Sequence, residues 1–292
     1  MTIDIRPLTP GFAGEVSGID ATHPLTPAEV STLEAGMDQY GVLIYHDQNI
    51  TDEQQKSFSL NFGALEETRG GTIANGPRLG AYMADVSNLD TNHKPLARDD
   101  RRRMFNLGNQ LWHSDSSFRA IPAKYSILSG RITVSQGGRT EFADMRTAYD
   151  MLDAGTKAEI ADLVCEHSLI YSRGALGFTG LTEDERAVFK PVRQRLVRTH
   201  PVTGRKSLFL SSHIGTIVGW PMPEARMFIR DLTEHALRCR DTYKHVWKQY
   251  DMVMWDNRTT MHRVTRFDDT KVRDMRRTTI AGEAVTVEQL AA

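Results

Sequence analysis

The sequence predicts a mainly β protein with flanking helices, an α+β chain built around a sandwich or a barrel. From residue 111 onward, short apolar runs alternate with turn signals, which is the pattern of such folds. Helical patterns are confined to a few segments, and the sequence has no glycine-rich phosphate loop of the dinucleotide or P-loop kind. A parallel βαβ sheet that binds a nucleotide is therefore disfavoured.

Two early helices are predicted from their start signals. Thr26 and Thr51 each stand three residues before a Glu or Gln, which is the capping-box arrangement, so we expect helices over 26–40 and 51–63. Between them, Gly41–His46 is a short, apolar and partly β-branched run. This run predicts a buried strand.

The second half of the chain supplies the other predicted elements. Helical patterns occur near 144–164 and 223–239, the second of them after two prolines. Strands are expected in YSILSG (125–130), LVRTH (196–200), SLFLSS (207–212), DMVMWDN (251–257), TTMHRV (259–264) and RRTTIAG (276–282).

Residues 66–110 form the least regular part of the chain. Four glycines and a proline lie between 70 and 80, and a charged run follows at 98–103. Long irregular segments inside a domain are often functional. We therefore expect a mobile substrate flap here, although a solvated surface loop would have a similar composition.

Composition excludes several classes of protein. The 292 residues include 36 Lys+Arg and 37 Asp+Glu, a balance that argues against a polycationic nucleic-acid binder and a polybasic membrane anchor. Hydrophobic residues make up 40% of the chain, enough for a large core, and we expect residues 1–292 to form one domain.

The cysteine content and the first residues of the sequence indicate the cellular compartment. With only Cys165 and Cys239, the sequence has no disulfide framework and no Cys-rich metal site. The first residues lack the apolar run of a signal peptide, and no stretch reaches the length of a membrane span. We expect a cytoplasmic protein.

The segment NQLWHSDSSF contains the first candidate site residues. His113 and Asp115 are two apart, and on an extended strand such residues point to the same side. An imidazole and a carboxylate would then converge on one point. Taken alone, the pair is better explained as a hydrogen-bonded surface pair.

A second histidine, His262, lies in the β-prone run near the C-terminus. Two histidines and one carboxylate on one face of a metal leave three coordination positions open, as in non-haem Fe(II) oxygenases. A zinc site with the same three ligands is a further option. Without partners, His262 is a satisfied core or surface histidine.

Arginines follow His262 at a suggestive distance. If residues 263–271 form a turn, the next strand returns beside the first and brings Arg273 near the metal. Its guanidinium could then hold a carboxylate through two hydrogen bonds. Arg277 shares that face of a strand, and Thr140, after a glycine pair, could add a hydroxyl donor. The alternative is a solvated basic edge strand.

Together these pieces resemble the Fe(II)/2-oxoglutarate-dependent dioxygenases of the taurine dioxygenase type. The resemblance is closer still to the aryloxyalkanoate dioxygenases that act on 2,4-dichlorophenoxyacetate, and it runs from about residue 5 to about 282. The segments that carry it, in order, are NQLWHSDSSF, GGRTEFADMRTAYD, LVRTH, GRKSLF and VMWDNR.

The resemblance implies a double-stranded β-helix, or jelly-roll, core and a set of site residues. His113, Asp115 and His262 are implied as ligands of Fe(II), used with O₂. Thr140 and Arg273 are implied as partners of the far carboxylate of the co-substrate 2-oxoglutarate. Asn109 and Arg277 match positions that face the prime substrate.

The implied reaction hydroxylates an aryloxyalkanoate beside its ether oxygen and yields a phenol, glyoxylate, succinate and CO₂. The flap near 68–80 would build an apolar slot for the ring from Ile73, Leu79 and Tyr82. A taurine- or alkylsulfate-type dioxygenase, a zinc hydrolase and a non-catalytic jelly-roll module stay open as alternatives. The expected partner is a small carboxylate, with no nucleic acid and no membrane, and the expected state is a homo-oligomer.

Overall fold

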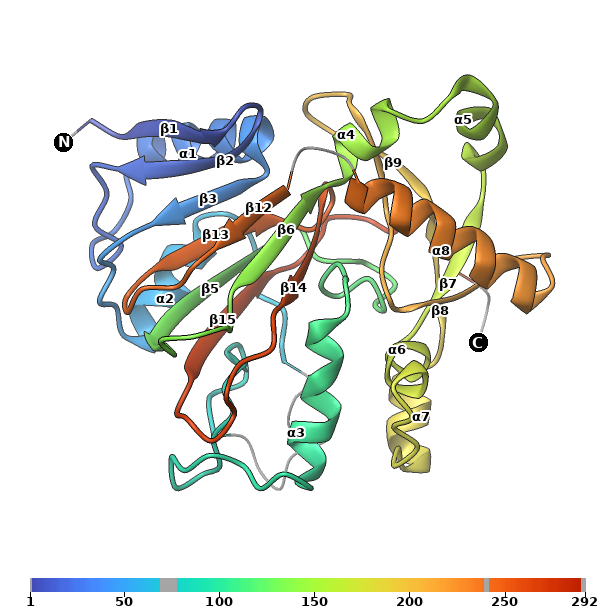
Figure 1. Ribbon diagram of the computed structural model, residues 1–292. Helices are drawn as coiled ribbons and strands as arrows, with labels where there is room; N and C mark the ends of the chain where they lie inside the picture. The colour runs from blue at the N-terminus through green and yellow to red at the C-terminus, as the bar shows by residue number, and fades with distance from the viewer. Residues whose placement is uncertain (1, 69–77, 239–241, 290–292) are drawn as a thin grey trace.

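Two facing β-sheets form the centre of the molecule in the computed structural model (Figure 1). The larger sheet has the strand order β1-β2-β3-β13-β5-β15-β4, and the smaller has the order β12-β6-β14. Within these sheets β2 and β3 run parallel, and the other pairs are antiparallel. The structure describes residues 2–68, 78–238 and 242–289. The expected jelly-roll architecture with flanking helices is confirmed.

Twenty-three helices and strands fall within the described residues, besides one 3₁₀ helix. The larger sheet contains β1 (Asp4–Thr9), β2 (Phe12–Ser17), β3 (Val42–Tyr45), β4 (Ala84–Asp85), β5 (Tyr125–Ile132), β13 (Met252–Asp256) and β15 (Asp274–Ile280). The smaller contains β6 (Thr140–Asp144), β12 (Thr242–His245) and β14 (Thr260–Val264). Two minor sheets contain β7 (Val164–His167), β8 (Val192–Arg195) and β11 (Ile214–Ile217), and β9 (Val197–Thr199) with β10 (Lys206–Leu208). The helices are α1 (Pro27–Tyr40), α2 (Asp52–Leu60), α3 (Arg101–Asn106), the 3₁₀ helix η2 (Leu107–Gln110), α4 (Met145–Asp150), α5 (Ala154–Ile160), α6 (Leu169–Ala175), α7 (Glu183–Val188) and α8 (Met222–Arg238).

Aromatic side chains fill the space between the two central sheets. Trp255 and Phe12 from the larger sheet are buried with Phe142 from the smaller sheet, and the rings of Phe142 and Trp255 lie 5.5 Å apart. Burying a large apolar side chain contributes about 1.5–3 kcal/mol. This packing holds β14, and with it His262, at a fixed distance from the larger sheet.

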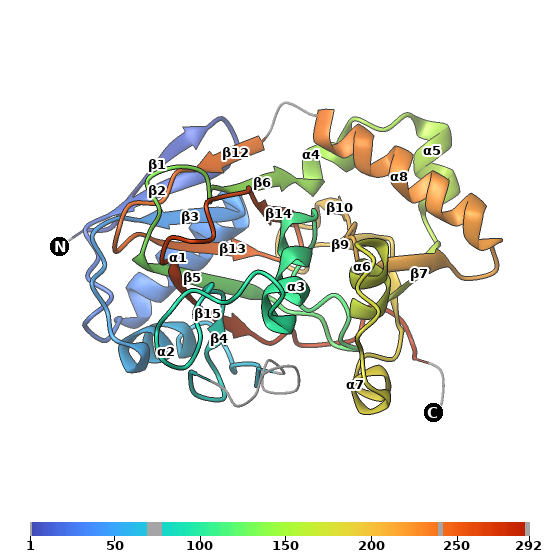
Figure 2. The ribbon, with the colours of Figure 1, turned by 60° about the horizontal axis from the view of Figure 1, so that its bottom comes forward.

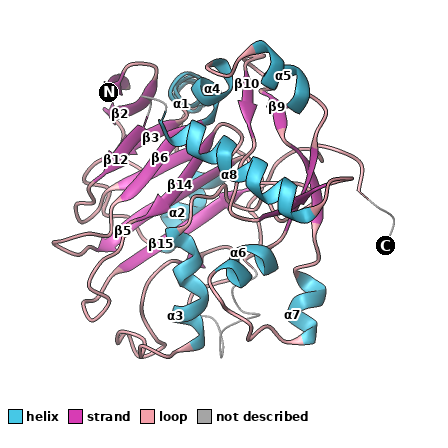
Figure 3. Ribbon diagram, turned by 45° about the vertical axis from the view of Figure 1, so that its right-hand side comes forward, coloured by secondary structure: helices cyan, strands magenta, loops and turns pink. Residues whose placement is uncertain are grey.

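Helices cover the outer faces of both sheets. α1 and α2 begin at Thr26 and Thr51, whose capping boxes form as the sequence predicts, and they pack on the larger sheet through Leu33 and Phe58. α8 covers the smaller sheet, where Leu232 packs near Met261 (Figure 3). No helix among the described residues is long and apolar enough to cross a membrane.

Helices α3 and α6 lie next to each other beside the central strands (Figure 2). They belong to one apolar cluster, to which α3 contributes Phe105 and α6 contributes Leu169. This pair of helices brings the segment before His113 against residues more than sixty positions later in the chain.

Several element boundaries differ from expectation. The helical stretch near 144–164 is split into α4 and α5, because Asp153 caps a new helix. The strand expected over 207–212 ends at Leu208. The segment 66–110 contains β4, α3 and η2, and the part of the expected flap at 69–77 lies outside the described residues.

The expected pairing of the last two strands was wrong. β14 pairs with β6 in the smaller sheet, whereas β15 pairs with β5 and β4 in the larger sheet. Residues 265–273 therefore cross between sheets and do not form a hairpin turn.

Candidate active site

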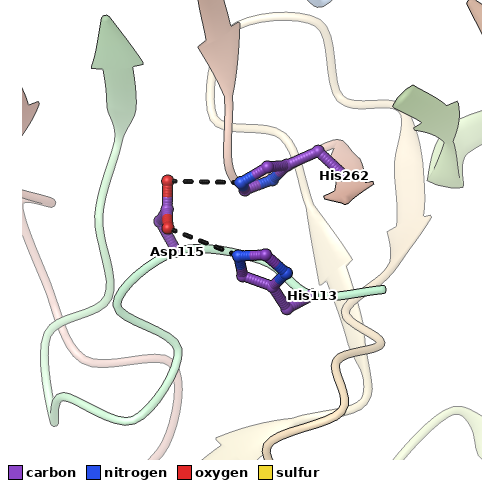
Figure 4. A group of neighbouring side chains, drawn as sticks. All are labelled: His113, Asp115 and His262. Carbon is purple, nitrogen blue, oxygen red and sulfur yellow. Dashed lines mark ion pairs between the residues drawn. The ribbon is translucent and has the colours of Figure 1, made fainter. Parts of the chain in front are cut away.

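Three side chains that the sequence predicts as metal ligands converge at the mouth of the jelly roll. One ligand atom from each of His113, Asp115 and His262 lies within 4.8 Å of the others, and all three residues are buried. The carboxylate of Asp115 faces both rings from one side (Figure 4), with its oxygens 3.8 Å from Nε2 of His113 and 3.6 Å from Nε2 of His262. The arrangement is a two-histidine, one-carboxylate triad with one open side.

The backbone fixes the separation of the two histidines. The amide of His113 donates to the carbonyl of His262 at 3.0 Å, and the amide of His262 donates back at 2.8 Å. His262 lies in β14 as expected, but His113 makes only this isolated bridge and Asp115 lies in the turn that follows. The side chains therefore converge through a bridge and a turn, because the expected regular strand does not form.

The ring of His113 presents one nitrogen to the metal position. Its Nδ1 lies 2.7 Å from the carbonyl oxygen of Leu111, which can only accept, so Nδ1 carries the proton and Nε2 is a free ligand atom. Burial lowers the pKa of His113, and burial together with His113 lowers the pKa of His262 well below its usual value. Both rings are therefore neutral at pH 7, the form that binds metals.

Asp115 is held by partners on both carboxylate oxygens. Oδ2 accepts from the hydroxyl of Ser126 at 2.8 Å, and Oδ1 pairs with Arg277. The side chain of Asn257 accepts from the Asp115 amide at 3.1 Å and donates to Ser126 at 3.0 Å. Burial alone raises the pKa of Asp115, but Arg277, the two histidines and Ser126 lower it to about 2.

This donor set fits a divalent iron ion. Two neutral imidazoles and one anionic carboxylate are ready to bind without losing a proton, and the open side leaves room for further ligands. The outer contacts to Leu111, Ser126 and Asn257 orient the ligands, as such partners do in metal sites.

Arg273 lies in a separate cleft of about 1060 Å³. Arg273 is 4% exposed, and its guanidinium stacks over Phe267 at 5.2 Å. Among the described residues, the guanidinium donates to two backbone carbonyls, those of Val86 at 3.3 Å and Gly138 at 3.4 Å. Burial lowers its pKa to about 10, so it keeps its charge at pH 7. Within the described part of the chain, no carboxylate pairs with it.

Thr140 lies at the start of β6, two residues after Gly138, and is 3% exposed. Its Oγ1 accepts from the indole Nε1 of Trp247 at 2.9 Å. The hydroxyl hydrogen of Thr140 is therefore directed away from Trp247 and is available to another acceptor.

A second cavity of about 230 Å³ opens beside the triad. His113, Asp115 and Arg277 line it, and Asn109 lines both this cavity and the cleft of Arg273. Its apolar lining includes Leu79, Met83, Phe105, Phe118, Leu169 and Phe189. Of the residues expected to form the ring slot, Leu79 is in place, Tyr82 is 46% exposed and outside the lining, and Ile73 lies outside the described residues.

Arg277 and Asn109, the two residues expected to face the substrate, both line this second cavity. Arg277 donates through Nη1 to Asp115, while its Nε is buried and has no hydrogen-bond partner among the residues that the structure describes. A register shift between Asp274 and Met275 interrupts the strand between Arg273 and Arg277, and the two guanidinium groups line different cavities.

Sequence reasoning missed several residues around the site. Arg173, His213, Ser126 and Trp247 come from segments with no motif of their own, and each reaches the site only through the fold. Asn257, which orients Asp115, was missed as well, although it lies in the segment VMWDNR that contributes to the resemblance.

Comparison with known proteins agrees with this geometry. The family described as "Taurine catabolism dioxygenase TauD, TfdA family" matches residues 4–279. The α-ketoglutarate-dependent 2,4-dichlorophenoxyacetate dioxygenase of Burkholderia sp. (strain RASC) is 42% identical over 286 residues, which cover 97% of this chain and 95% of that protein. The (S)-phenoxypropionate/alpha-ketoglutarate-dioxygenase of Sphingobium herbicidovorans is 35% identical over 296 residues, which cover 99% of this chain and 98% of that protein.

A solved structure extends the similarity to the whole fold. The crystal structure of AAD-2 in complex with Mn(II) and N-oxalylglycine is 60% identical in sequence and superimposes with a TM-score of 0.95. The match covers 98% of this chain and 100% of that one. The chain therefore belongs to the TauD/TfdA family and is an α-ketoglutarate-dependent dioxygenase.

Proposed function

We propose that this enzyme hydroxylates an aryloxyalkanoate, such as 2,4-dichlorophenoxyacetate, at the carbon beside the ether oxygen. The unstable product then collapses to a phenol and glyoxylate, while 2-oxoglutarate and O₂ yield succinate and CO₂. One observation carries the choice of substrate: the cavity beside the triad combines an apolar lining with the cationic Arg277. An aromatic ring with one carboxylate matches both features.

As a member of its family, the enzyme uses Fe(II), with 2-oxoglutarate and O₂ as co-substrates. We assign His113, Asp115 and His262 to the metal, and Arg273 and Thr140 to the far carboxylate of 2-oxoglutarate. When bound, the metal supplies the oxidising chemistry. The protein supplies positioning and keeps competing reactions out.

Each assigned side chain has a donor or an acceptor to offer. Arg273 brings a buried charge without a carboxylate partner, and Thr140 brings a hydroxyl hydrogen that Trp247 leaves free. At the substrate end, Arg277 has a buried Nε without an acceptor, and the side-chain amide of Asn109 can donate into the cavity. A carboxylate at Arg277 would place the neighbouring carbon near the metal.

The test of this proposal is a substrate panel scored by succinate formation. Phenoxyacetates should be turned over faster than taurine or an alkyl sulfate, and they should release glyoxylate and a phenol in equal amounts. Replacing Arg277 by Ala should raise KM for phenoxyacetate far more than for 2-oxoglutarate. If taurine or an alkyl sulfate is the faster substrate, the aryloxy assignment is wrong and the metal assignment is unaffected.

A spectroscopic experiment tests the metal and co-substrate assignments separately. Anaerobic Fe(II) with 2-oxoglutarate should give a weak visible charge-transfer band, which should be lost in His262→Ala. A band that persists unchanged in this variant would remove His262 from the ligand set.

The remaining expectations concern the whole protein. The single domain over 1–292, the mobile flap near 66–110, the cytoplasmic location and the homo-oligomeric state stay predictions. Limited proteolysis, subcellular fractionation and light scattering in solution check them.

A further inference from the structure

An unpaired buried cation lies in the wall of the substrate cavity. Arg173, in α6, is 4% exposed and lines the cavity beside the triad. Burial lowers its pKa to about 10, so the guanidinium is charged at neutral pH. A buried charge is costly unless a partner of opposite charge compensates it.

The contacts of Arg173 are all with uncharged groups. Nη1 donates to the hydroxyl of Ser172 at 3.1 Å, and Nη2 lies 3.4 Å from Oδ1 of Asn109. The guanidinium stacks over Phe105 at 4.4 Å. Its Nε is buried and has no hydrogen-bond partner in the part of the chain that the structure describes.

The other arginines that line this cavity contrast with Arg173. Each of the others pairs with a carboxylate: Arg78 with Asp85 and Asp274, Arg102 with Asp100, Arg119 with Glu66, and Arg277 with Asp115. Among the described residues, Arg173 pairs with no carboxylate. The segment 69–77 contains no Asp or Glu in its sequence.

The fold makes room for the guanidinium at this place. A Cβ atom on Gly108 would lie 2.4 Å from Cζ of Arg173, so only a glycine in η2 allows the close approach. Phe105 and Gly108 thus confine the group, while Asn109 lies at its edge. The protein holds a charged donor in the cavity without supplying its counter-charge.

We propose that Arg173, with Asn109, forms a second anion-recognition subsite and selects prime substrates that carry a carboxylate. This proposal rests on the proposed function and adds Arg173 to Arg277 as a specificity-determining cation. An anionic substrate compensates the buried charge, whereas a neutral analogue of the same shape leaves it uncompensated. The pocket therefore discriminates by charge as well as by shape.

The first test compares phenoxyacetate with neutral phenoxyacetamide in Arg173→Met. KM for the acid should rise about tenfold to a hundredfold, the loss expected for a charge-assisted contact, and KM for the amide should not rise. KM for 2-oxoglutarate should not change. Arg173→Lys, which keeps the charge, should recover part of the preference for the acid.

Arg198 offers a matched control. It too is a buried guanidinium that stacks on a phenylalanine, Phe209, at 4.7 Å, and burial lowers its pKa to about 10. It lines a different cavity, far from the triad in sequence and separate from both active-site cavities. Arg198→Met should leave the acid-to-amide ratio unchanged.

A nearly isosteric change tests the same idea from the partner's side. Asn109→Asp places a carboxylate next to Nη2 of Arg173, so the charge of Arg173 is compensated before any substrate binds. This variant should bind phenoxyacetate less tightly than the wild type, with a smaller loss for the amide. Equal losses for acid and amide in both Arg173→Met and Asn109→Asp would overturn the proposal.

Direct binding separates this inference from the proposed function. Phenoxyacetate is titrated calorimetrically into enzyme loaded with Mn(II) and N-oxalylglycine. If the wild type binds the acid without turning it over, the proposed function fails, and a weaker affinity in Arg173→Met still supports the subsite. If the wild type does not bind the acid, or binds it as Arg173→Met does, the subsite is wrong.

Discussion

The hydrogen bond between the His113 ring and the Leu111 carbonyl sets which nitrogen of His113 meets the metal. His262 has no such partner among the described residues, since its Nδ1 is buried without a hydrogen bond. Its orientation depends on packing, with the ring 4.6 Å from Trp255 and 4.3 Å from His113. The two histidines are thus positioned by different physical means.

Removing any one ligand should disable the site. His113→Ala, Asp115→Ala and His262→Ala should each nearly abolish 2-oxoglutarate turnover, because two ligands hold iron poorly. Mn(II) should raise the Tm of the wild type, since it binds only the folded state, and should raise it much less in the variants. His23→Ala, at an exposed histidine, serves as the control. A ligand variant that keeps both full activity and its metal would show that the altered residue is not a ligand.

At the co-substrate end, Arg273→Lys should raise KM for 2-oxoglutarate well above any effect on the prime substrate. Lysine keeps the charge but loses the forked donor pair. The loss of a charge-assisted contact costs roughly 1.5–3 kcal/mol, or about tenfold to a hundredfold in KM. An unchanged KM would mean that Arg273 only stabilises the loop that it bridges.

Trp247 should act on the same carboxylate through Thr140. Trp247→Phe removes the indole donor, so the Thr140 hydroxyl can turn away from the co-substrate. The expected cost is that of a neutral hydrogen bond, about 0.5–1.5 kcal/mol, seen as a twofold to tenfold rise in KM for 2-oxoglutarate. The same rise in Thr140→Val, with no further rise in the double variant, would show that the two residues act as one unit.

Which of these residues a sequence can indicate depends on whether their pattern is local. His113 and Asp115 are two residues apart, so their convergence follows from short-range geometry. Arg173 and Trp247 are single residues whose partners lie 64 and 107 positions away. Nothing in their own neighbourhood distinguishes them from core or surface residues.

At the scale of elements, η2 and α6 approach each other closely at Gly108 and Arg173 in the cavity wall. Gly108→Ala should displace the Arg173 guanidinium, because the new methyl carbon would lie 2.4 Å from Cζ. KM for phenoxyacetate should rise, whereas KM for 2-oxoglutarate should not change. Gly174→Ala, where a Cβ meets no atom within 4 Å, is the control, and equal effects from both changes would contradict the steric argument.

Elements with local signals are the ones that the sequence predicts well. The capping boxes of α1 and α2 involve residues three apart, and both form as expected. Strand partners are set by contacts across the whole chain. The sequence of residues 259–282 therefore does not indicate that β14 and β15 join different sheets. The same holds for the bulge between Asp274 and Met275.

At the scale of the molecule, buried histidines should make the metal-free protein sensitive to acid. Both ring nitrogens of His167 are buried and have no hydrogen-bond partner within residues 2–68, 78–238 and 242–289, and burial lowers the pKa of His167 to about 3. The unfolded chain takes up this proton near pH 6.5, whereas the folded protein does not. Stability is therefore lost as the pH falls below about 6.5, by about 2 kcal/mol between pH 7 and pH 5 from this residue.

Urea unfolding at the two pH values tests this expectation. His167→Leu should lose about 2 kcal/mol less than the wild type on going from pH 7 to pH 5. His23→Leu, at an exposed histidine, should behave like the wild type. Equal losses in His167→Leu and the wild type would show that His167 takes up its proton in the folded protein as readily as in the unfolded chain.

The backbone bridge between His113 and His262 has a consequence for protein synthesis. A ribosome releases His113 and Asp115 before it releases β13, β14 and β15, and β5 needs β13 and β15 on its two sides. A nascent or prematurely terminated chain thus holds His113 and Asp115 but cannot assemble the metal site. All three ligands can therefore surround one metal ion only after β14 has been synthesised and has paired in the fold.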